Sequence, residues 1–432
     1  MDFTSDLKVL YSILLFLWIE YLWELYLEIR QYQLCKKTEE VPVELRNVMQ
    51  KETFNKARSY TLAKDKFGFV KSAFSIITST YVIYSGLLAS IWSYSVSISP
   101  WEGEVAPSCI WLFLLTSLST VVELPFSVYH TFVLEEAYGF NKQTPRFFIF
   151  DKIKGYILSQ CLTLPICSII ILIVKYGGHL FFVWLWIAVG IITLVLLTIY
   201  PSYIAPLFDK YTPLPEGELR SEIEKLAADL KFPLGQLYVV EGSKRSAHSN
   251  AYFYGLFGAK RIVLFDTLLA NPESGGCQQD EVLAVLSHEL GHWKHGHVTK
   301  NIVIMQTNLL LIFIVFAFMF RYPPIYQAVG FPPNLQPVLV GLLVVMQYIM
   351  MPYNALLSFL LTCLSRYFEF QADTFAKNLG KAEPLQSALV QLNKDNLGFP
   401  VYDSLFSAWH HSHPPLLQRL NALKSEQHSK QE

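Results

Sequence analysis

Residues 156–204 read YILSQCLTLPICSIIILIVKYGGHLFFVWLWIAVGIITLVLLTIYPSYI, which is two long apolar runs joined by Tyr176-Gly177-Gly178-His179. A helix that crosses the hydrocarbon core of a bilayer needs about 20 mostly apolar residues. Both runs meet that length, and the two glycines favour a tight turn between them. The stretch therefore predicts a hairpin of two membrane-spanning helices.

The same test, applied outward along the chain, predicts seven membrane spans in all. They cover residues 8–29, 73–95, 109–133, 156–175, 180–204, 301–321 and 337–362. The N-terminus has no basic region and no small-residue cleavage site, so the first run is expected to be a span rather than a signal peptide.

Composition agrees with a membrane protein. Charged residues make up 16% of the 432 residues and hydrophobic residues 52%, whereas about a quarter of an ordinary soluble domain is charged. The net charge of -1 provides no basic face for phosphates, so we expect a lipid bilayer and no nucleic acid as a partner. The six cysteines are scattered without a CxxC pair, which predicts buried thiols rather than a disulfide framework.

Lysine and arginine predict the orientation of the spans. Ten of them lie between residues 30 and 71, after the first span, whereas residues 96–108 carry none. Basic residues accumulate in cytosolic connections. We therefore expect the N-terminus in the lumen, and residues 205–300 and the C-terminus in the cytosol.

Four regions follow from these patterns. Residues 1–204 would hold spans one to five with their cytosolic loops, and residues 301–362 spans six and seven. Residues 205–300 combine an amphipathic run at 219–230 with strand-like segments at 236–240 and 261–265. This predicts a mainly helical cytosolic catalytic region with a small β element, continued by residues 363–432, which end in a polar tail.

The strongest chemical signal is Ser287-His288-Glu289-Leu290-Gly291-His292-Trp293. On a helix, His288 and His292 lie one turn apart and can reach the same metal ion, while Glu289 can hold and deprotonate a metal-bound water. Catalytic zinc takes three protein ligands and leaves one position open. The pattern therefore predicts a zinc hydrolase with a third ligand elsewhere.

The position of that third ligand separates the zinc protease classes. The metzincin pattern requires glycine at 295 and histidine at 298, and this chain has His295 and Val298, so that class is excluded. We interpret His295 and His297 as polar-face residues. The preferred third ligand is Glu369, with Asp373 one turn further on orienting a ligating histidine through its second ring nitrogen.

Two further stretches offer substrate contacts. Residues 409–415 read WHHSHPP, where His413 could donate to an oxyanion and His410 and His411 are interpreted as structural; Arg366 and Arg419 are alternative donors. Residues 246–255 read SAHSNAYFYG. This pattern fits an extended edge to which a peptide could add as a strand, and it equally fits a buried hairpin strand.

Carboxylates in the first span form a separate pattern. Glu20, Glu24 and Glu28 follow i, i+4 spacing and share one helix face. Intramembrane carboxylates usually face a bundle interior or water, and Glu123 in the third span would agree with a wet interior. The alternative is that Glu28 and Glu24 reach the membrane interface.

Taken together, the motifs resemble the type I CAAX prenyl protease family, integral-membrane zinc endopeptidases of the endoplasmic reticulum. The resemblance rests on ordered matches along nearly the whole chain. They are Lys56-Ala57-Arg58-Ser59-Tyr60, Leu124-Pro125-Phe126, Glu136-Ala137-Tyr138-Gly139-Phe140-Asn141, Asn250-Ala251-Tyr252, Arg261-Ile262-Val263-Leu264-Phe265-Asp266, the residues from His288 to Trp293, those from Glu369 to Asp373, and Ser412-His413-Pro414-Pro415. One departure is Ser287, where many relatives have glycine or alanine.

The resemblance implies an all-α membrane barrel of seven helices around a large water-filled chamber, closed by a zincin-like cytosolic domain. It also implies the roles of the site residues. One zinc ion would be held by His288, His292 and Glu369, with Glu289 as general base, Asp373 in support, and Asn250, Ala251, Tyr252 and His413 at the substrate.

The implied activity is removal of the last three residues from proteins with a prenylated C-terminal cysteine. Some family members make a second, upstream cut in a lamin precursor or a mating pheromone. We expect a monomer in the endoplasmic reticulum membrane, and the sequence leaves open whether it also lies in the inner nuclear membrane.

Two other classes of protein share some of these features. A site-2-type intramembrane protease places its His-Glu motif inside an apolar span, whereas residues 278–281 and 294–300 are polar here. A non-enzymatic seven-span receptor or transporter with structural zinc would close its site with four ligands, and the chain offers only three at convincing spacing.

Overall fold

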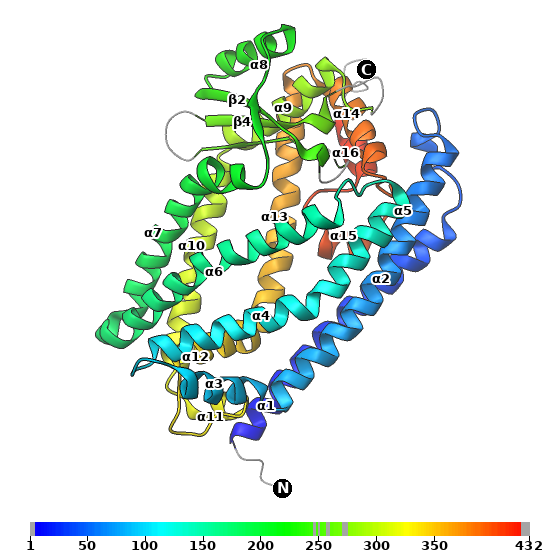
Figure 1. The fold of residues 1–432 in the computed structure, drawn as a ribbon. Helices are drawn as coiled ribbons and strands as arrows, with labels where there is room; N and C mark the ends of the chain where they lie inside the picture. Colours follow the sequence, from blue (N-terminus) through cyan, green and yellow to red (C-terminus); the bar gives the residue numbers. More distant parts are fainter. Residues whose placement is uncertain (1–4, 245–247, 249–250, 256–259, 270–274, 425–432) are drawn as a thin grey trace, which may run out of the picture.

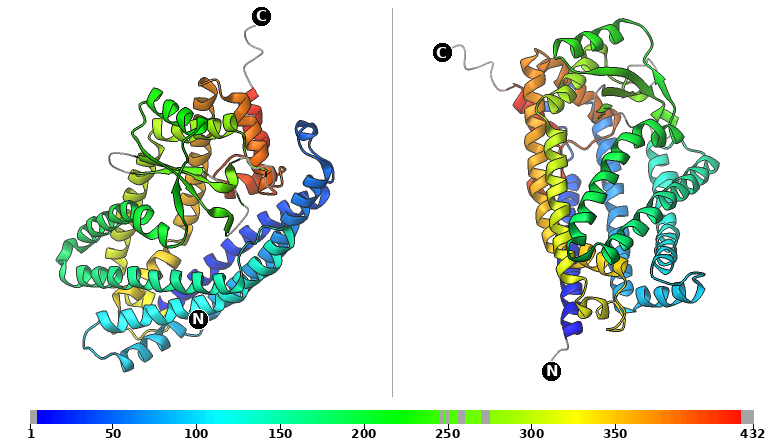
Figure 2. Two further views of the ribbon diagram at one scale, coloured as in Figure 1. Left: turned by 45° about the horizontal axis from the view of Figure 1, so that its top comes forward. Right: turned by 90° about the vertical axis from the view of Figure 1, so that its left-hand side faces the viewer.

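The computed structural model describes residues 5–244, 248, 251–255, 260–269 and 275–424. In this part of the chain, long helices lie at one end of the molecule and a smaller helical region with one sheet lies at the other (Figures 1 and 2). The long helices form a membrane barrel around a chamber. Five helices are long and apolar enough to cross a membrane, and two bent helix pairs raise the number of spans to as many as seven. The expected fold class is confirmed.

Each of the five candidate spans contains one long α-helix. They are α1 (Ser5–Lys37), α4 (Val105–Tyr129), α6 (Pro145–Tyr176), α7 (Phe181–Ile199) and α10 (His297–Met319). Short helical turns extend two of the spans, to Val105–Tyr138 and Gly178–Leu207. Only 6% to 17% of the apolar window in each of the five spans is buried. Most of their side chains therefore face lipid or the interior rather than a neighbouring helix, as a hollow barrel requires.

The segment at 73–95, expected to be one straight span, is bent in the structure. Here α2 (Lys51–Tyr84) and α3 (Leu87–Ile98) meet at an angle of 61°. The bend coincides with Gly86, which adopts a φ of +68° open mainly to glycine. A Cβ atom on the facing Gly330 would lie 2.8 Å from the Gly86 Cα atom, so the close approach requires glycine at position 330, while the positive φ favours glycine at position 86.

The last predicted span, 337–362, is also broken. The helix α12 (Val338–Val344), with the π-helical turn η8 (Val345–Ile349), meets α13 (Met351–Asn378) at 60°. Beyond the bend, α13 runs on past the predicted end of the span into the catalytic region (Figure 1). One helix thus connects the membrane barrel to the predicted third metal ligand.

The catalytic region combines short helices with a four-stranded sheet. The helices are α8 (Glu218–Asp229), α9 (Gln279–Lys294), α14 (Ala382–Asp395), α15 (Ser404–His410) and α16 (Leu416–Lys424). The strands are β1 (Tyr211–Pro213), β2 (Leu234–Val240), β3 (Ala251–Tyr254) and β4 (Lys260–Phe265), in the order β1-β2-β4-β3. The predicted strands at 236–240 and 261–265 correspond to β2 and β4, which pair in parallel.

Smaller helices complete the described chain. They are α5 (Glu136–Tyr138), which follows α4 through the π-helical turn η2 (His130–Glu135), and α11 (Pro323–Gln327). Two separate cores stabilise the two ends of the molecule. One lies in the membrane barrel and includes Trp111, Phe316 and Tyr326, and the other joins the sheet to α8 and α9 and includes Ile223 and Leu264.

The C-terminal half of helix α1 contacts the C-terminal region of the chain. Arg30 forms a two-pronged ion pair with Asp403, which also caps α15. On the same side, Glu24 accepts a hydrogen bond from Trp409 Nε1 at 2.7 Å and lies 3.2 Å from His410 Nε2. Glu24 therefore helps to dock α15 on α1, and whether it also lies at the membrane interface stays a prediction. That Glu20 and Glu28 face the chamber stays a prediction.

The cysteines are free thiols. Cys35 and Cys277 are buried, but Cys161 and Cys363 are exposed on the protein surface, so the expectation of buried thiols is wrong for these two. Both lie on helices of the membrane barrel, α6 and α13, where an exposed apolar thiol suits contact with lipid.

Candidate active site

The His-Glu-Leu-Gly-His motif, residues 288–292, lies in the C-terminal half of α9. Gln278 and Glu281 form a reciprocal capping box at its N-terminus. Residues 282–288 are all buried, because α9 is enclosed by the sheet core on one side and α13 on the other. Ser287, the departure from the family pattern, is fully buried and donates its hydroxyl to the Leu283 carbonyl at 2.8 Å.

Three side chains from two helices converge on one point. The Nε2 atoms of His288 and His292 lie 3.1 Å apart, and the Glu369 carboxylate of α13 lies 3.4 Å and 3.2 Å from them. One ligand atom from each of the three residues falls within 4.8 Å of the others. The predicted metal-ligand set is therefore brought together.

The donor set fits a divalent metal ion. Oxygen Oε2 of Glu369 is buried and accepts no hydrogen bond among the described residues. Arg419 Nη1 lies 3.5 Å away, and a metal ion between the three ligands would add the close contact that a buried carboxylate needs. Two imidazole nitrogens and one carboxylate are the ligands of many catalytic zinc sites. The chain thus has room and chemistry for one ion at this position.

Behind the ligands, Asp373 lies where the sequence predicted it. Its Oδ1 atom is 2.8 Å from His288 Nδ1, and Arg419 of α16 binds both Asp373 oxygens, at 2.8 Å and 2.6 Å. Burial lowers the pKa of His288, but its contacts with Asp373 and Glu369 outweigh burial and raise the pKa above 6.5. Metal binding must displace that proton, because a ligating imidazole is neutral.

Arg419 is buried with its guanidinium against Asp373, and it also lines the cleft. Its role as an alternative oxyanion donor therefore stays a prediction. Arg366 donates to Ser407 and Gln418, which fixes α15 and α16 on α13. The sequence signal for the burial of Arg419 is its spacing from three leucines on the apolar face of its helix, Leu416, Leu420 and Leu423.

Glu289 lies beside the ligands and lines the same cleft, which measures about 290 Å³. Burial raises the pKa of the Glu289 carboxyl above its ordinary value of 4.5, although the neighbouring histidines oppose the shift. A carboxylate that holds a proton more readily than usual is suited to accept one from water near neutral pH.

His413 also lines the cleft, on the loop between α15 and α16. Its Nε2 atom lies 3.3 Å from Glu369, and its side chain is 67% exposed, so it can reach a substrate. The neighbouring histidines are structural, as expected. His410 contacts Glu24, and His411 packs edge-on against Tyr402.

The strand at 251–254 combines both alternatives, because β3 ends the sheet and also pairs antiparallel with β4, the next strand along the chain. Among the described residues, β3 pairs with no other strand. Ala251 lines the cleft, whereas the Tyr252 hydroxyl lies 3.2 Å from that of Tyr211. Asn250 lies outside the described residues.

His297 corrects a prediction. It was assigned to a polar face, but it is 2% exposed and its Nδ1 atom lies 2.9 Å from His292 Nδ1. The reason is that α9 ends at Lys294, and Gly296, at a φ of +67°, starts α10 in a new direction. The Lys-His-Gly sequence, with glycine in a typical helix-ending position, was the available signal. His295 is exposed, as expected.

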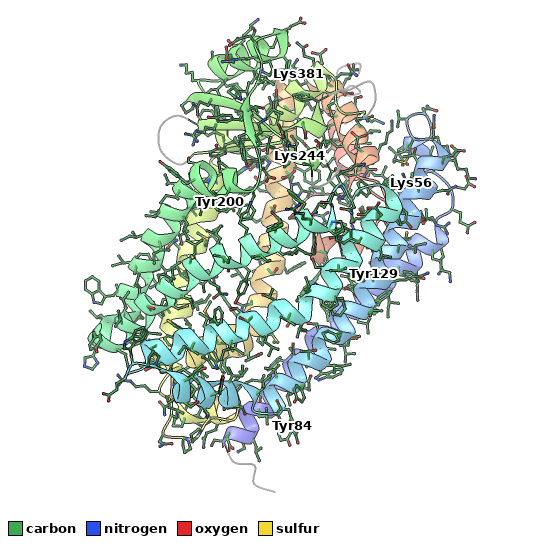
Figure 3. The ribbon with its side chains drawn as sticks, viewed as in Figure 1. Lys56, Tyr84, Tyr129, Tyr200, Lys244 and Lys381 are labelled. Carbon is green, nitrogen blue, oxygen red and sulfur yellow. The ribbon has the colours of Figure 1, made fainter. Side chains whose placement is uncertain are left out.

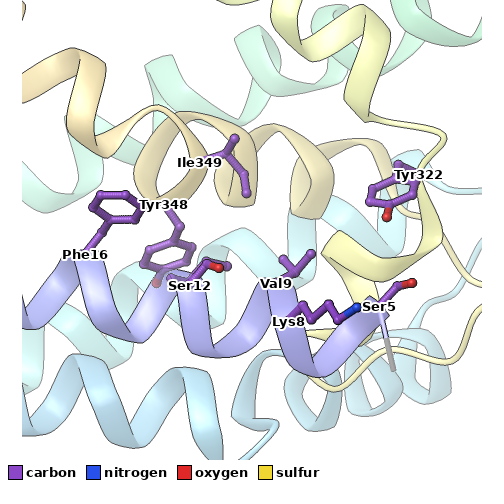
Figure 4. A pocket seen from close by; sticks show the side chains of 9 residues that line it. Ser5, Lys8, Val9, Ser12, Phe16, Tyr322, Tyr348 and Ile349 are labelled. Atoms are coloured by element: carbon purple, nitrogen blue, oxygen red, sulfur yellow. The ribbon is translucent and has the colours of Figure 1, made fainter. Parts of the chain in front are cut away.

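A second cavity, about 350 Å³ in size, lies at the N-terminal end of α1 (Figure 4). Ser5, Lys8 and Ser12 face Tyr322 and Tyr348 across it. Its lining includes no histidine, cysteine or carboxylate, so it offers no comparable chemistry.

A membrane barrel with a buried His-His-Glu cluster and an adjacent glutamate defines the class of protein: a membrane-embedded metallopeptidase. Residues 31–210 match the family model "CAAX prenyl protease N-terminal, five membrane helices", and residues 213–427 match "Peptidase family M48". The chain therefore belongs to the type I CAAX prenyl protease family within peptidase family M48.

Individual relatives align with this chain over nearly its full length. The chain is 49% identical to "CAAX prenyl protease 1 homolog" of Mus musculus, covering 98% of this chain and 97% of the relative. It is 48% identical to the Homo sapiens protein of the same name, with the same coverage. Among solved structures, S. mikatae Ste24p matches with a TM-score of 0.90 at 36% identity, covering 98% of this chain and 100% of that one.

Proposed function

We propose that this protein is a zinc-dependent endopeptidase that removes the last three residues from proteins whose C-terminal cysteine is prenylated. The observation that carries the proposal is the convergence of His288, His292 and Glu369 beside the Glu289 carboxylate. Membership of the CAAX prenyl protease family supports the substrate class. A second, upstream cleavage, a monomeric state, and location in the endoplasmic reticulum membrane belong to the same proposal.

The proposed mechanism assigns each side chain one task. His288, His292 and Glu369 would hold zinc, which polarises the scissile carbonyl and makes water more acidic when it is bound. The substrate peptide binds as a strand at the edge of the sheet that β3 forms, with contacts to Asn250, Ala251 and Tyr252. Its scissile carbonyl then enters the cleft lined by Glu289 and His413.

Proton transfer falls to Glu289. Its carboxylate takes a proton from the attacking water and returns it to the leaving amine. His413 donates a hydrogen bond to the oxyanion that develops on the attacked carbonyl. Asp373, held by Arg419, accepts from His288 Nδ1–H and so keeps Nε2 of that ring available as the ligand.

The assignment of Glu289 predicts the result of replacing it. Glu289→Gln keeps the size of the side chain but removes the base, so cleavage should fall by about 10²- to 10⁴-fold or more while zinc stays bound. Zinc per chain and the cleavage rate are measured on the same purified sample. Asp280→Asn is the matched control, because it removes an exposed carboxylate from the same helix. Full cleavage by a zinc-loaded Glu289→Gln protein would contradict the assignment.

The substrate class is tested with peptides. Purified protein is incubated with a farnesylated and an unmodified C-terminal peptide, with and without chelator, and the products are identified by mass spectrometry. We expect a three-residue product from the farnesylated peptide, its loss with chelator and its return with zinc. A longer substrate shows in the same assay whether an upstream product forms. Equal cleavage of both peptides would remove prenylation from the proposal.

A further inference from the structure

We propose that His297 is a positioning residue that orients His292 for metal binding and fixes its tautomer. The inference rests on the proposed metal site and adds a residue to it. It concerns His292, the second imidazole of the motif. Asp373 contacts His288, so the Nδ1 atom of His292, on the side of the ring away from the other ligands, needs a different partner.

The hydrogen-bond chain has one consistent direction. His297 Nε2 lies 3.0 Å from Gln371 Oε1, and an amide oxygen can only accept, so Nε2 carries the hydrogen. His297 Nδ1 is then an acceptor, 2.9 Å from His292 Nδ1. His292 must therefore carry its hydrogen on Nδ1, which leaves Nε2 with a free lone pair facing His288 and Glu369.

The chain continues in the same sense beyond Gln371. Its side-chain nitrogen lies 3.1 Å from the Tyr367 hydroxyl, which agrees with the amide oxygen pointing toward His297. Tyr367 and Gln371 lie one turn apart on α13, the helix that also supplies Glu369. The orientation of the His292 ring therefore depends on α13, the helix that also carries the third ligand.

Packing holds the His297 ring in place. The ring is 2% exposed and stacks on Phe368 with 3.9 Å between ring centroids and 8° between planes. Phe368 directly precedes Glu369 in the chain. The imidazole therefore contacts both metal-ligand helices, which restricts how far either can shift relative to the other.

The backbone explains how His297 reaches this position. On one continuous helix, residues five apart point about 140° away from each other, so His297 could not face His292. The break at Gly296, in the left-handed conformation, returns the chain toward the site. His295, one residue before that break, is exposed and is a natural control.

The two ligating histidines thus have unlike partners. His288 faces a carboxylate that Arg419 neutralises, whereas His292 faces an imidazole. Partners of this kind typically change metal affinity by 10- to 100-fold when they are removed. A neutral acceptor fixes the ring of His292 without adding a second negative charge behind the ligands.

The test measures zinc affinity by competition with a chromogenic chelator. His297→Phe keeps the aromatic stack on Phe368 but removes the acceptor, so zinc should bind about 10- to 100-fold more weakly. Thermal unfolding of the metal-free protein shows whether the variant is folded. His297→Asn restores an acceptor near the Nδ1 position and should recover most of the affinity. His295→Phe should bind zinc like the unmodified protein.

Two outcomes overturn the inference: unchanged affinity in His297→Phe, or an equal loss in His297→Asn. If His297→Phe fails to fold, Gln371→Leu decides, because it keeps the His297 ring but removes the acceptor that orients it. Unchanged zinc affinity in Gln371→Leu then overturns the inference. His292→Ala separates this from the proposed function, since stoichiometric zinc in that variant would refute the metal site itself.

Discussion

At the scale of single residues, Glu289 predicts how activity depends on pH. Burial raises the pKa of its carboxyl above 4.5, and a general base acts only when it is unprotonated. As the pH falls through the pKa of this carboxyl, the base is lost, so kcat/KM should fall on the acidic side. Burial moves this limb to higher pH, and a zinc ion held beside the carboxylate would oppose that shift. The profile is measured with zinc content followed at each pH. A profile without an acidic limb, or a limb that only follows loss of zinc, would contradict this explanation.

Local spacing decided which site residues could be predicted from the sequence. His288, Glu289 and His292 share one helix, where i, i+4 geometry is known before folding. Glu369 lies 77 residues beyond His292 and was chosen because catalytic zinc needs a third ligand. His297 was missed because its approach to His292 depends on a helix break, which a continuous helical pattern hides.

At the scale of elements, the site depends on how closely α9 and α13 cross. Gly291 lies at the crossing, where an added Cβ atom would be 3.0 Å from the Ala372 Cα atom and 3.2 Å from Phe375. The nearest obstacle is backbone and cannot rotate away. Any side chain at position 291 must therefore move apart the helices that carry His292 and Glu369.

Gly291→Val should destabilise the protein by about 1–3 kcal/mol, the usual cost of overpacking a close contact. It should also weaken zinc binding, because the ligands on the two helices separate. Both effects are measured by thermal unfolding of the metal-free protein and by chelator competition. Gly68→Val is the matched control, since a Cβ atom at this position of α2 meets nothing within 4 Å. Equal effects at both positions would refute the role of the crossing.

Apolar runs located the membrane helices but not their bends. Residues 73–95 are apolar enough for one span, yet the chain turns by 61° between α2 and α3. The turn is made at Gly86, whose φ is positive, and it lies against Gly330, which is far from Gly86 in sequence. Hydropathy measures how apolar a segment is, and it does not depend on contacts between residues that are distant in sequence.

At the scale of the whole molecule, the two ends differ in character. Tyr84 lies at the end near the N-terminus, whereas Lys56, Lys244 and Lys381 lie toward the end that holds the catalytic region (Figure 3). The helix α2 has 34 residues, roughly 50 Å at 1.5 Å per residue, and a bilayer core is about 30 Å thick. Its lysine-rich first turns can therefore project beyond the hydrocarbon on the catalytic side.

This asymmetry predicts that the catalytic region faces the cytosol and the N-terminus faces the lumen, because lysine and arginine accumulate on the cytosolic side. A flexible insertion with one Asn-Ser-Thr acceptor is placed between α3 and α4, at residues 99–104, or between β1 and α8, at residues 214–217. Only the first should receive a glycan, since glycans are added in the lumen. The readout is a mobility shift that glycosidase reverses, in insertions that still cleave substrate. A glycan at 214–217 and none at 99–104 would invert the orientation and place the metal site on the lumenal side.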